Sequence, residues 1–460
     1  MTKLVISASD FQSQVADLLP SNKGTKSQLT LSLIQCYSLL DGFDHVITKP
    51  ACSKSDLLKF HSLKYVGIIL DEKLNKNLPF DNDEEALSGL NDLRAAWNET
   101  HYDEPNKARY IFEKKSDLLS YFNEFSLIPT VKSCKSSFGD AFDKIRLDNN
   151  ASESEDDLDT YNLEGDCPLF SYLPMYCQTV TGASLLLADY IGKSERTVAI
   201  NWDGGRHHAF KGRASGFCYV NDIVLLIQKL RKKGFQKMSY VDFDLHHGDG
   251  VEKAFQFSSN IQTLSLHLFE PGFFPCTGSL EDSKKGKNIF NIPLLHGLND
   301  AFLFSLVNRI IKPLISSHEP EILLIQCGGD GLIGDSFEEW QLSIRGLSEC
   351  IMNLLTEFKK CSVILLGGGG YNVTVMSRFY TYLTSKILTK YKNDYMKSIS
   401  LEFSEDALIP EHEFVEQYAE EHYKFWYYEL EGSLKRKTLK NDNRIEYITK
   451  LENLYRIRIP

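Results

Sequence analysis

The amino-acid sequence predicts an α/β protein with a single open parallel β-sheet flanked by helices. From residue 166 onward, short apolar runs alternate with longer amphipathic stretches, which is typical of strands connected by helices. Runs such as Ile322-Leu323-Leu324-Ile325 are apolar without interruption, as in strands covered on both faces. A chain of 460 residues, 42% of them hydrophobic, can form one large domain with an insertion or two ordinary domains.

Local sequence patterns predict the individual helices and strands along the chain. Residues 26–40 place apolar side chains at helical spacing, and a short helix is expected over 53–61, capped by Ser53 or Ser55. Apolar runs predict strands at 197–201, 238–243, 261–266, 321–326 and 362–366. Amphipathic stretches predict helices at 219–232, 301–315, 337–358 and 373–389. After residue 408, an aromatic helix is expected to pack back on the sheet.

Residues from about 71 to 159 differ in composition from the rest of the chain. They are rich in lysine and acidic residues, and the acidic run 152–157 predicts disorder near 150–160. We interpret this region as a large insertion into one domain spanning 1–460. The core of that domain covers 160–390, and 391–460 form a C-terminal helical segment that packs on the core. A small independent helical module at 71–159 is the alternative.

Composition limits the classes of function. A net charge of −11 argues against direct binding of nucleic acid and favours a basic protein partner or substrate. The ten cysteines show no paired C-x-x-C spacing, which is typical of a reducing compartment. Polar residues interrupt the N-terminus early, and no apolar run reaches membrane-spanning length. The expectation is a soluble intracellular protein that contacts no membrane.

The segment that follows the strand at 238–243 carries the strongest chemical signal. Side chains alternate along a strand, so Asp242, Asp244 and His246 leave the backbone on the same side. Two carboxylates and an imidazole would be costly to bury without a compensating cation. Zinc binds both kinds of ligand, and a catalytic zinc takes three protein ligands. A solvated loop after a strand is the alternative.

Three further strand ends add reactive side chains, and in a parallel sheet such ends meet at one edge. They carry His207 and His208, then Asp330, then Tyr371 after four glycines. Together these residues predict a metal-dependent hydrolase. Asp244, His246 and Asp330 could hold zinc, one histidine could act as general base and later as acid, and Asp242 and Asp249 could orient the imidazoles. Tyr371 could donate to the developing oxyanion, a role worth roughly 3 kcal/mol.

Five segments in this order resemble the zinc-dependent histone deacetylases. They are Gly-Gly-Arg-His-His-Ala at 204–209, Ala-Ser-Gly-Phe-Cys-Tyr-Val-Asn-Asp at 214–222, the stretch 242–250, Pro-Gly-Phe-Phe-Pro at 271–275 and Gly-Gly-Gly-Gly-Tyr at 367–371. The resemblance covers most of 166–380, with weaker similarity at 26–37, 57–65 and 409–418. It is closest to class I, and the chain resembles a divergent fungal Hos-type member.

The resemblance implies the arginase/deacetylase fold, removal of acetyl groups from lysine side chains, and a role for each matching residue. It implies zinc on Asp244, His246 and Asp330, a general base His208 oriented by Asp249, a companion His207 paired with Asp242, and Tyr371 as oxyanion donor. Gly216, Phe217 and Phe274 would form the acetyl-lysine tunnel, and Phe337 would narrow its mouth. Asp166 would hold the substrate backbone at the rim. Potassium would bind at Asp242, Asp244, His246 and Ser265, with a second ion at Phe255, Ser258 and Ile261.

The resemblance also implies biological context. The expected substrates are acetylated lysines of histone tails or other chromosomal proteins, and the expected role is transcriptional repression in the nucleus, with the cytoplasm as a further location. A protein complex is a possible setting. Ser336 and Thr374 stand where inositol-phosphate-binding members carry arginine, so inositol phosphate is not expected to bind. The alternatives are a deacetylase of small acetylated amines and a catalytically weak scaffold that binds acetyl-lysine.

Overall fold

The computed structural model describes residues 2–71, 111–112, 158–170, 172–430 and 439–456. Most of the insertion predicted at 71–159, including its acidic run, lies outside the described residues. Within the described part of the chain, no helix is both long enough and apolar enough to cross a membrane.

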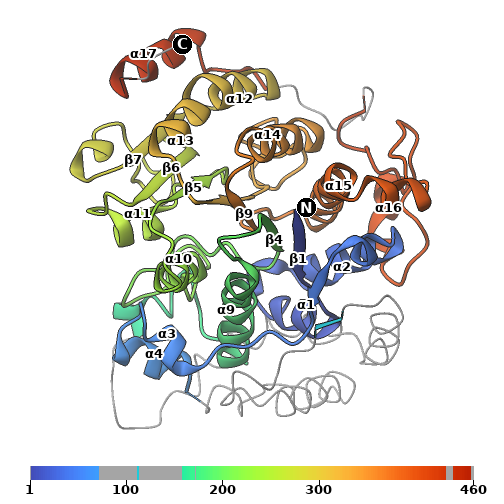
Figure 1. The fold of residues 1–460 in the computed structure, drawn as a ribbon, viewed down its shortest axis with the longest axis horizontal. Helices are drawn as coiled ribbons and strands as arrows, with labels where there is room; N and C mark the ends of the chain where they lie inside the picture. Colours follow the sequence, from blue (N-terminus) through green and yellow to red (C-terminus); the bar gives the residue numbers. More distant parts are fainter. Residues whose placement is uncertain (1, 72–110, 113–157, 171, 431–438, 457–460) are drawn as a thin grey trace.

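A twisted sheet runs through the centre of the molecule in the order β3-β2-β1-β4-β9-β8-β5-β6-β7 (Figure 1). Eight of its strands are parallel, and the two-residue strand β3 pairs antiparallel with β2 at one edge. The predicted parallel α/β sheet is therefore confirmed. The strands are β1 Lys3–Ser7, β2 His45–Ile47, β3 Ile111–Phe112, β4 Thr197–Asn201, β5 Met238–Asp242, β6 Ile261–Leu268, β7 Ile289–Leu294, β8 Ile322–Gln326 and β9 Ser362–Leu366.

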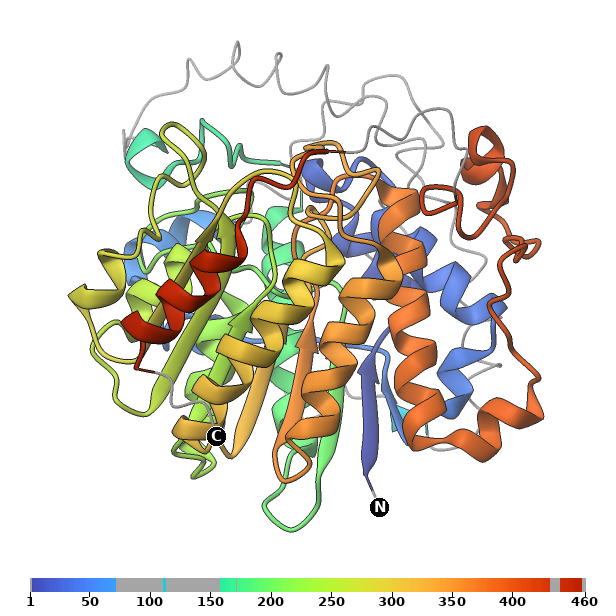
Figure 2. The ribbon, with the colours of Figure 1, turned by 90° about the horizontal axis from the view of Figure 1, so that it is seen from above.

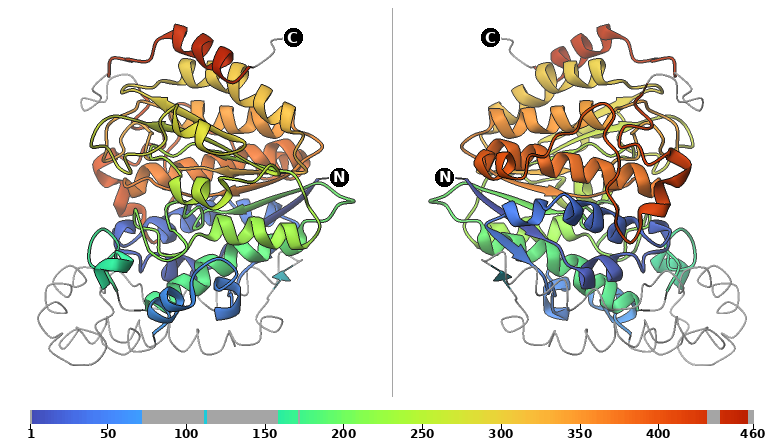
Figure 3. Two further views of the ribbon diagram at one scale, coloured as in Figure 1. Left: turned by 90° about the vertical axis from the view of Figure 1, so that its left-hand side faces the viewer. Right: turned by 90° about the vertical axis from the view of Figure 1, so that its right-hand side faces the viewer.

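Helices cover both faces of the sheet (Figures 2 and 3). They are α1 Asp10–Ala16, α2 Lys26–Cys36, α3 Lys54–Leu57, α4 Leu63–Ile69, α9 Leu173–Tyr190, α10 Asp222–Lys232, α11 Asp249–Phe255, α12 Asp300–Leu306, α13 Lys312–His318, α14 Ile344–Glu357, α15 Val373–Tyr391, α16 Asn393–Ser398 and α17 Ile445–Leu454. A π-helical turn, η6 (Val307–Ile311), joins α12 to α13. Short 3₁₀ turns are η1 Pro20–Asn22, η2 Leu39–Gly42, η4 Leu158–Tyr161, η5 Asp282–Lys285 and η7 Val415–Glu421.

The alternation of side chains along each strand divides the core between these two layers. In β9, Val363 and Leu365 join the core built with α2, α12, α14 and α15, whereas Ile364 and Leu366 join the core built with α1, α9 and α10. Every residue of β9 is buried. This two-sided burial explains why the central strands are apolar along their whole length.

Several helices begin or end away from their predicted bounds because polar side chains cap them. The helix predicted at 337–358 begins only at Ile344, where Ser343 Oγ accepts a hydrogen bond from the Gly346 amide at 2.8 Å. Residues 337–343 are therefore a loop, and Phe337 lies on it. The helix predicted at 219–232 begins at Asp222, after Asn221 accepts from the Val224 amide at 3.0 Å. The stretch predicted as one helix at 301–315 contains the π-helical turn.

The C-terminal tail after residue 408 packs on helices α2, α14 and α15, not on the sheet as predicted. The expected aromatic helix is the 3₁₀ turn η7 followed by further turns, and Trp426 lies under the guanidinium of Arg345, 4.0 Å from the ring centroid. Arg378 of α15 forms an ion pair with Glu421, and both side chains are buried. Helix α17 lies against α12 and η6 (Figure 1).

Candidate metal and catalytic site

The four central strands bring the predicted chemical groups to one edge of the sheet. Neighbouring strands β4, β9, β8 and β5 end in register, with Asn201 beside Leu366, Leu366 beside Gln326, and Gln326 beside Asp242. The loops that carry the histidine pair, Tyr371, Asp330 and the Asp244–His246 segment therefore start at the same level. This convergence at the carboxyl ends of parallel strands is where α/β proteins build their sites.

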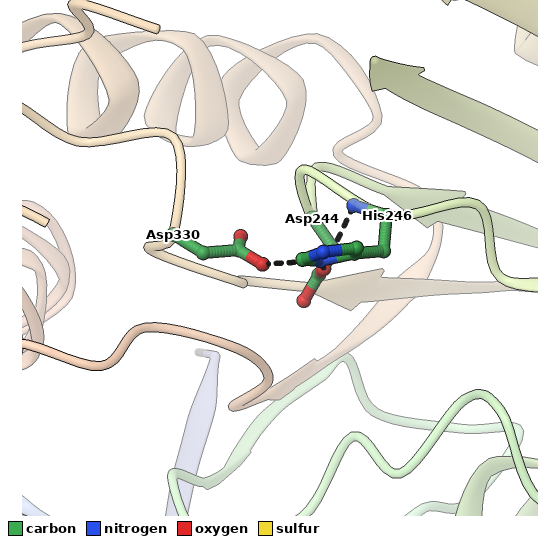
Figure 4. A group of neighbouring side chains, drawn as sticks. All are labelled: Asp244, His246 and Asp330. Carbon is green, nitrogen blue, oxygen red and sulfur yellow. Dashed lines mark hydrogen bonds and ion pairs between the residues drawn. The ribbon is translucent and has the colours of Figure 1, made fainter. Parts of the chain in front are cut away.

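Asp244, His246 and Asp330 form a buried cluster, with one ligand atom from each lying within 4.8 Å of the others (Figure 4). His246 Nδ1 is 2.9 Å from Asp330 Oδ2 and 3.4 Å from Asp244 Oδ1. Within the described residues, this is the only group of three or more acidic, histidine or cysteine side chains arranged closely enough to hold a metal ion.

Hydrogen bonds fix both carboxylates of this cluster. Asp244 Oδ2 accepts from the Gly369 amide and from Gln326 Nε2, each at 2.8 Å, and Asp330 Oδ1 accepts from the Leu245 amide at 2.8 Å. A Cβ added to Gly369 would stand 2.5 Å from Asp330 Oδ2 and 2.9 Å from Asp244 Oδ2, so only glycine lets the backbone approach this closely.

The electrostatics of the cluster fit a small divalent cation. Burial, together with the charge of Asp244, raises the pKa of Asp330. Although burial opposes the shift, His207 and His246 lower the pKa of Asp244. Asp330 therefore resists being charged beside Asp244 without a compensating cation. Although burial opposes its protonation, Asp244 and Asp330 raise the pKa of His246 to about 10, so the site attracts positive charge. Two carboxylate oxygens and one imidazole nitrogen are donors that zinc accepts.

His207 and His208 stand side by side but in different electrostatic surroundings. Each Nδ1 pairs with a carboxylate at 2.8 Å, from Asp242 for His207 and from Asp249 for His208. Burial and the neighbouring His207 lower the pKa of His208 to about 4, whereas for His207 the carboxylate of Asp242 overcomes burial and raises the pKa to about 9. At neutral pH, His208 is therefore the neutral histidine of the pair.

Tyr371 is anchored through its backbone at both ends. Its amide donates to Asp335 Oδ2 at 2.6 Å, and its carbonyl oxygen accepts from Lys23 Nζ at 2.9 Å. Burial raises the pKa of the Tyr371 phenol well above its ordinary value, so the phenol keeps its proton and can donate a hydrogen bond.

Partly exposed aromatic side chains stand over the cluster. Phe217, Phe274 and Phe337 are each between 37% and 39% exposed. The Phe274 ring lies 5.0 Å from that of His208 and the Phe337 ring 4.8 Å from that of His246, measured between centroids. Gly216 has φ +53°, and a Cβ there would stand 2.4 Å from the His208 ring. Gly216 and Phe217 line a cavity with His207, His208 and Tyr371, and the Phe274 and Phe337 rings lie against His208 and His246. We call this cavity, together with the two rings, the opening.

Asp166 supports the loop that carries the tunnel residues. Its Oδ2 accepts from the Gly216 amide at 2.6 Å, and its Oδ1 accepts from Asn162 Nδ2. The predicted contact of Asp166 with a substrate backbone stays a prediction.

The residues predicted to bind potassium fall in two places. Ser265 pairs with Asp242 across β5 and β6, next to the cluster, and its hydroxyl is 3.0 Å from His267 Nδ1. Phe255, Ser258 and Ile261 meet in the turn between α11 and β6, where the Ile261 amide donates to Ser258 Oγ at 3.1 Å. Both potassium sites stay predictions.

Three residues that the sequence reasoning missed support the site. Asp335 holds Tyr371, Lys26 Nζ donates to the Gly368 carbonyl at 2.9 Å, and Arg206 Nη2 donates to the Asp203 carbonyl at 3.1 Å. Burial, then the nearby Arg206, lower the pKa of Lys26 to about 8. Lys26 is the first residue of α2 and follows a polar turn, so no local pattern singles it out.

Comparisons with known proteins agree with this geometry. The model of the family described as "Histone deacetylase domain" matches residues 20–387. The chain is 50% identical to histone deacetylase HOS1 of Saccharomyces cerevisiae, over 99% of this chain and 100% of that protein. It is 40% identical to histone deacetylase 8 of Xenopus laevis, over 57% of this chain and 78% of that protein. It is 39% identical to histone deacetylase 1 of Homo sapiens, over 53% of this chain and 50% of that protein.

Proposed function

The chain belongs to the histone deacetylase family, and on that premise we propose that it is a zinc-dependent hydrolase of N6-acetyl-lysine in histones or other chromosomal proteins. The observation that carries the proposal is the convergence of three groups below one aromatic opening. These are the Asp244–His246–Asp330 cluster, the His208–Asp249 pair and Tyr371.

The three ligands of the cluster would hold zinc, which would supply Lewis acidity and lower the pKa of a bound water to about 7. The aromatic rings of Phe217 and Phe274 suit the uncharged aliphatic stem of acetyl-lysine, and Phe337 narrows the opening. A free lysine ammonium would lose its hydration in such surroundings, so the opening favours the acetylated form.

We assign the proton transfers to the histidine pair. His208 is neutral at neutral pH and can accept a proton from the attacking water, while Asp249 holds its Nδ1. The same imidazole can then protonate the departing lysine amine. His207 carries positive charge beside Asp242, and this charge stabilises negative charge that develops nearby. Tyr371 donates its phenol proton in a hydrogen bond to the developing oxyanion.

The remaining assignments belong to the same proposal. We propose one deacetylase domain with an insertion, potassium as an accessory ion through Ser265, residence in the nucleus and a role in transcriptional repression. Neither Ser336 nor Thr374 offers a cation for inositol phosphate, and Thr374 Oγ1 instead donates to Glu421 Oε1 at 2.5 Å.

The decisive test is release of acetate from acetyl-lysine peptides by the purified full chain. Wild type is compared with His208→Ala, with and without a zinc chelator, and acetylated spermidine serves as a small-amine substrate. We expect release from peptides that both the substitution and the chelator abolish. A folded, zinc-loaded protein that binds the peptides but releases no acetate would contradict the proposal and favour the scaffold alternative. Preferential turnover of the small amine would contradict the assigned substrate.

A further inference from the structure

A second pocket opens beside the hairpin that follows the histidine pair. It has a volume of about 580 Å³ and shares no lining residue with the cavity around His207 and His208. We call it the basic pocket and define it by three apolar and three cationic residues, which are Phe60, Phe210, Ala254, Lys211, Arg213 and Lys253. Its volume lies within the range of roughly 300–1,000 Å³ that is usual for ligand pockets.

Backbone hydrogen bonds hold the walls of the basic pocket. The hairpin is closed by the Phe210 amide, which donates to the Arg213 carbonyl at 3.0 Å. The segment after α3 is tied to the hairpin because the Ser62 amide donates to the Lys211 carbonyl at 2.8 Å. The third wall is helix α11, which carries Lys253 and Ala254. The pocket is therefore preformed, which lowers the entropic cost of binding.

The cations of the basic pocket are exposed, and no carboxylate of the described residues forms an ion pair with any of them. Lys253 Nζ donates to Gln256 Oε1 at 3.1 Å. The Arg213 guanidinium lies over the Phe210 ring, 4.7 Å from its centroid, a cation–π contact. In a chain of net charge −11, three such cations around an apolar floor form a local region of positive charge.

We propose that the basic pocket binds an acidic peptide segment of a partner protein. Carboxylates would pair with the ammonium of Lys211 and with the guanidinium of Arg213, whose geometry matches that of a carboxylate. One bulky apolar side chain would cover Phe60 and Phe210. Nucleic acid fits this surface less well, since it needs many phosphate contacts along a track, and the net charge of the chain opposes it.

The position of the basic pocket places its occupant next to the backbone of the candidate active site. Phe210 follows His208 by two residues, and Gly250, which also lines the pocket, follows Asp249. A Cβ on Gly250 would stand 2.6 Å from the His207 carbonyl oxygen. The proposal concerns binding, however, and does not require that the chain be a deacetylase.

The test uses fluorescence anisotropy of a labelled peptide in which a central phenylalanine is flanked by glutamates. The full chain should bind it saturably at low salt, and Lys211→Glu/Arg213→Glu should weaken binding about tenfold or more. Lys359→Glu/Lys360→Glu, at two exposed lysines between α14 and β9, makes the same change in net charge and should weaken binding about twofold or less. Phe210→Ser tests the apolar floor, and thermal melting checks the folding of each variant.

Four results would overturn the proposal: no binding by wild type, equal weakening in both double variants, unchanged affinity when the phenylalanine of the peptide is replaced by serine, or equally tight binding of single-stranded DNA of the same charge. None of these results bears on acetate release. Conversely, absence of acetate release would leave binding at the basic pocket to be judged by these measurements alone.

Discussion

Tyr371 offers the sharpest test at the scale of one residue. Tyr371→Phe removes only the hydroxyl, so the backbone bonds to Asp335 and Lys23 remain. We expect bound zinc to stay unchanged and kcat to fall about 10²–10³-fold, the usual cost of losing an oxyanion donor. Metal analysis and acetyl-peptide turnover measure the two quantities. Tyr427→Phe, on the C-terminal tail, is the matched control. Near-normal turnover of Tyr371→Phe would contradict the assigned role.

Lys23 is expected to position Tyr371 without touching the substrate. Its ammonium reaches the Tyr371 carbonyl at 2.9 Å and Ser336 Oγ at 3.4 Å, and thereby joins the turn before α2 to the two loops that flank the opening. Lys23→Met should lower kcat several-fold and change KM little, while Lys23→Arg should restore part of the loss. Lys54→Met, at an exposed lysine of α3, should behave as wild type. Equal kcat values for Lys23→Met and Lys54→Met would show that Lys23 has no positioning role.

Many of the candidate site residues that the sequence could predict lie close together in the chain. Asp242, Asp244, His246 and Asp249 lie within eight consecutive residues, and His207 and His208 are adjacent, so short-range pattern alone groups them. Most of the supports that it missed are pairs across long sequence separations, such as Lys23 with Tyr371 and Asp335 with the Tyr371 amide. The spacing of residues in the sequence does not indicate such pairs, because only the fold brings the two residues together.

At the scale of elements, His296 joins two loops that carry aromatic residues of the opening. Its Nε2 is 2.9 Å from Glu270 Oε2, close to Phe273 and Phe274 in sequence, and its Nδ1 is 2.5 Å from Glu339 Oε2, two residues after Phe337. The hydrogen bonds that its ring nitrogens donate to Glu270 and Glu339 raise the pKa of His296 despite partial burial. The protonated imidazole can donate to both carboxylates at once and so join the two loops.

This arrangement predicts a specific pH dependence. Because the folded-state pKa of His296 is raised, its stabilisation is fully present below the ordinary pKa of about 6.5 and is lost as pH rises through the folded-state value. His296→Gln should lower Tm by roughly 1–2 °C at pH 5.5 and by less at pH 9, since the side chain is partly exposed. Thermal melts of both proteins across this range measure the difference. A difference that grows with pH would contradict the prediction.

The sequence predicted strands and helices where burial requires a regular pattern of apolar residues. It predicted the ends of these elements less well. The five predicted strands all exist, whereas β1, β2, β3 and β7 were missed. Strands β2 and β3 have only three and two residues, too few to show a periodicity. In β7, Asn291 and Pro293 interrupt the apolar run. The cap at Ser343 decided the start of α14, and with it the loop position of Phe337.

At the scale of the whole molecule, the sequence could predict the parallel α/β architecture because uninterrupted apolar runs alternate with helical patterns. It could not predict the order of the strands. The order places β9 and β8 between β4 and β5, so segments that are distant in the chain become neighbours at the edge that carries the site. The histidine pair and the Asp244–His246 segment meet Tyr371 and Asp330 only through these crossovers.

The same crossovers would make the proposed metal binding a property of the whole fold. Asp244 and His246 follow β5, Asp330 follows β8, and Gly369, which donates to Asp244, follows β9. The unfolded chain cannot present these groups together, so zinc that binds only the folded chain must stabilise it. Free zinc at about a thousand times Kd would add about 4 kcal/mol, enough to raise Tm by several degrees.

We therefore expect a zinc chelator to lower Tm of the full chain by several degrees and added zinc to restore it, as followed by circular dichroism. Asp330→Asn keeps the size of the side chain but removes one charged ligand, so its Tm should respond little to chelator or zinc. Asp282→Asn, at a carboxylate that hydrogen-bonds Ser279 away from the cluster, keeps the full response and controls for loss of charge. Equal responses of the two variants would show that zinc stabilises the chain at another place. Metal analysis should show that wild type contains zinc before chelation and none afterwards. If the Tm of wild type then stays unchanged, the stability of the fold does not depend on zinc.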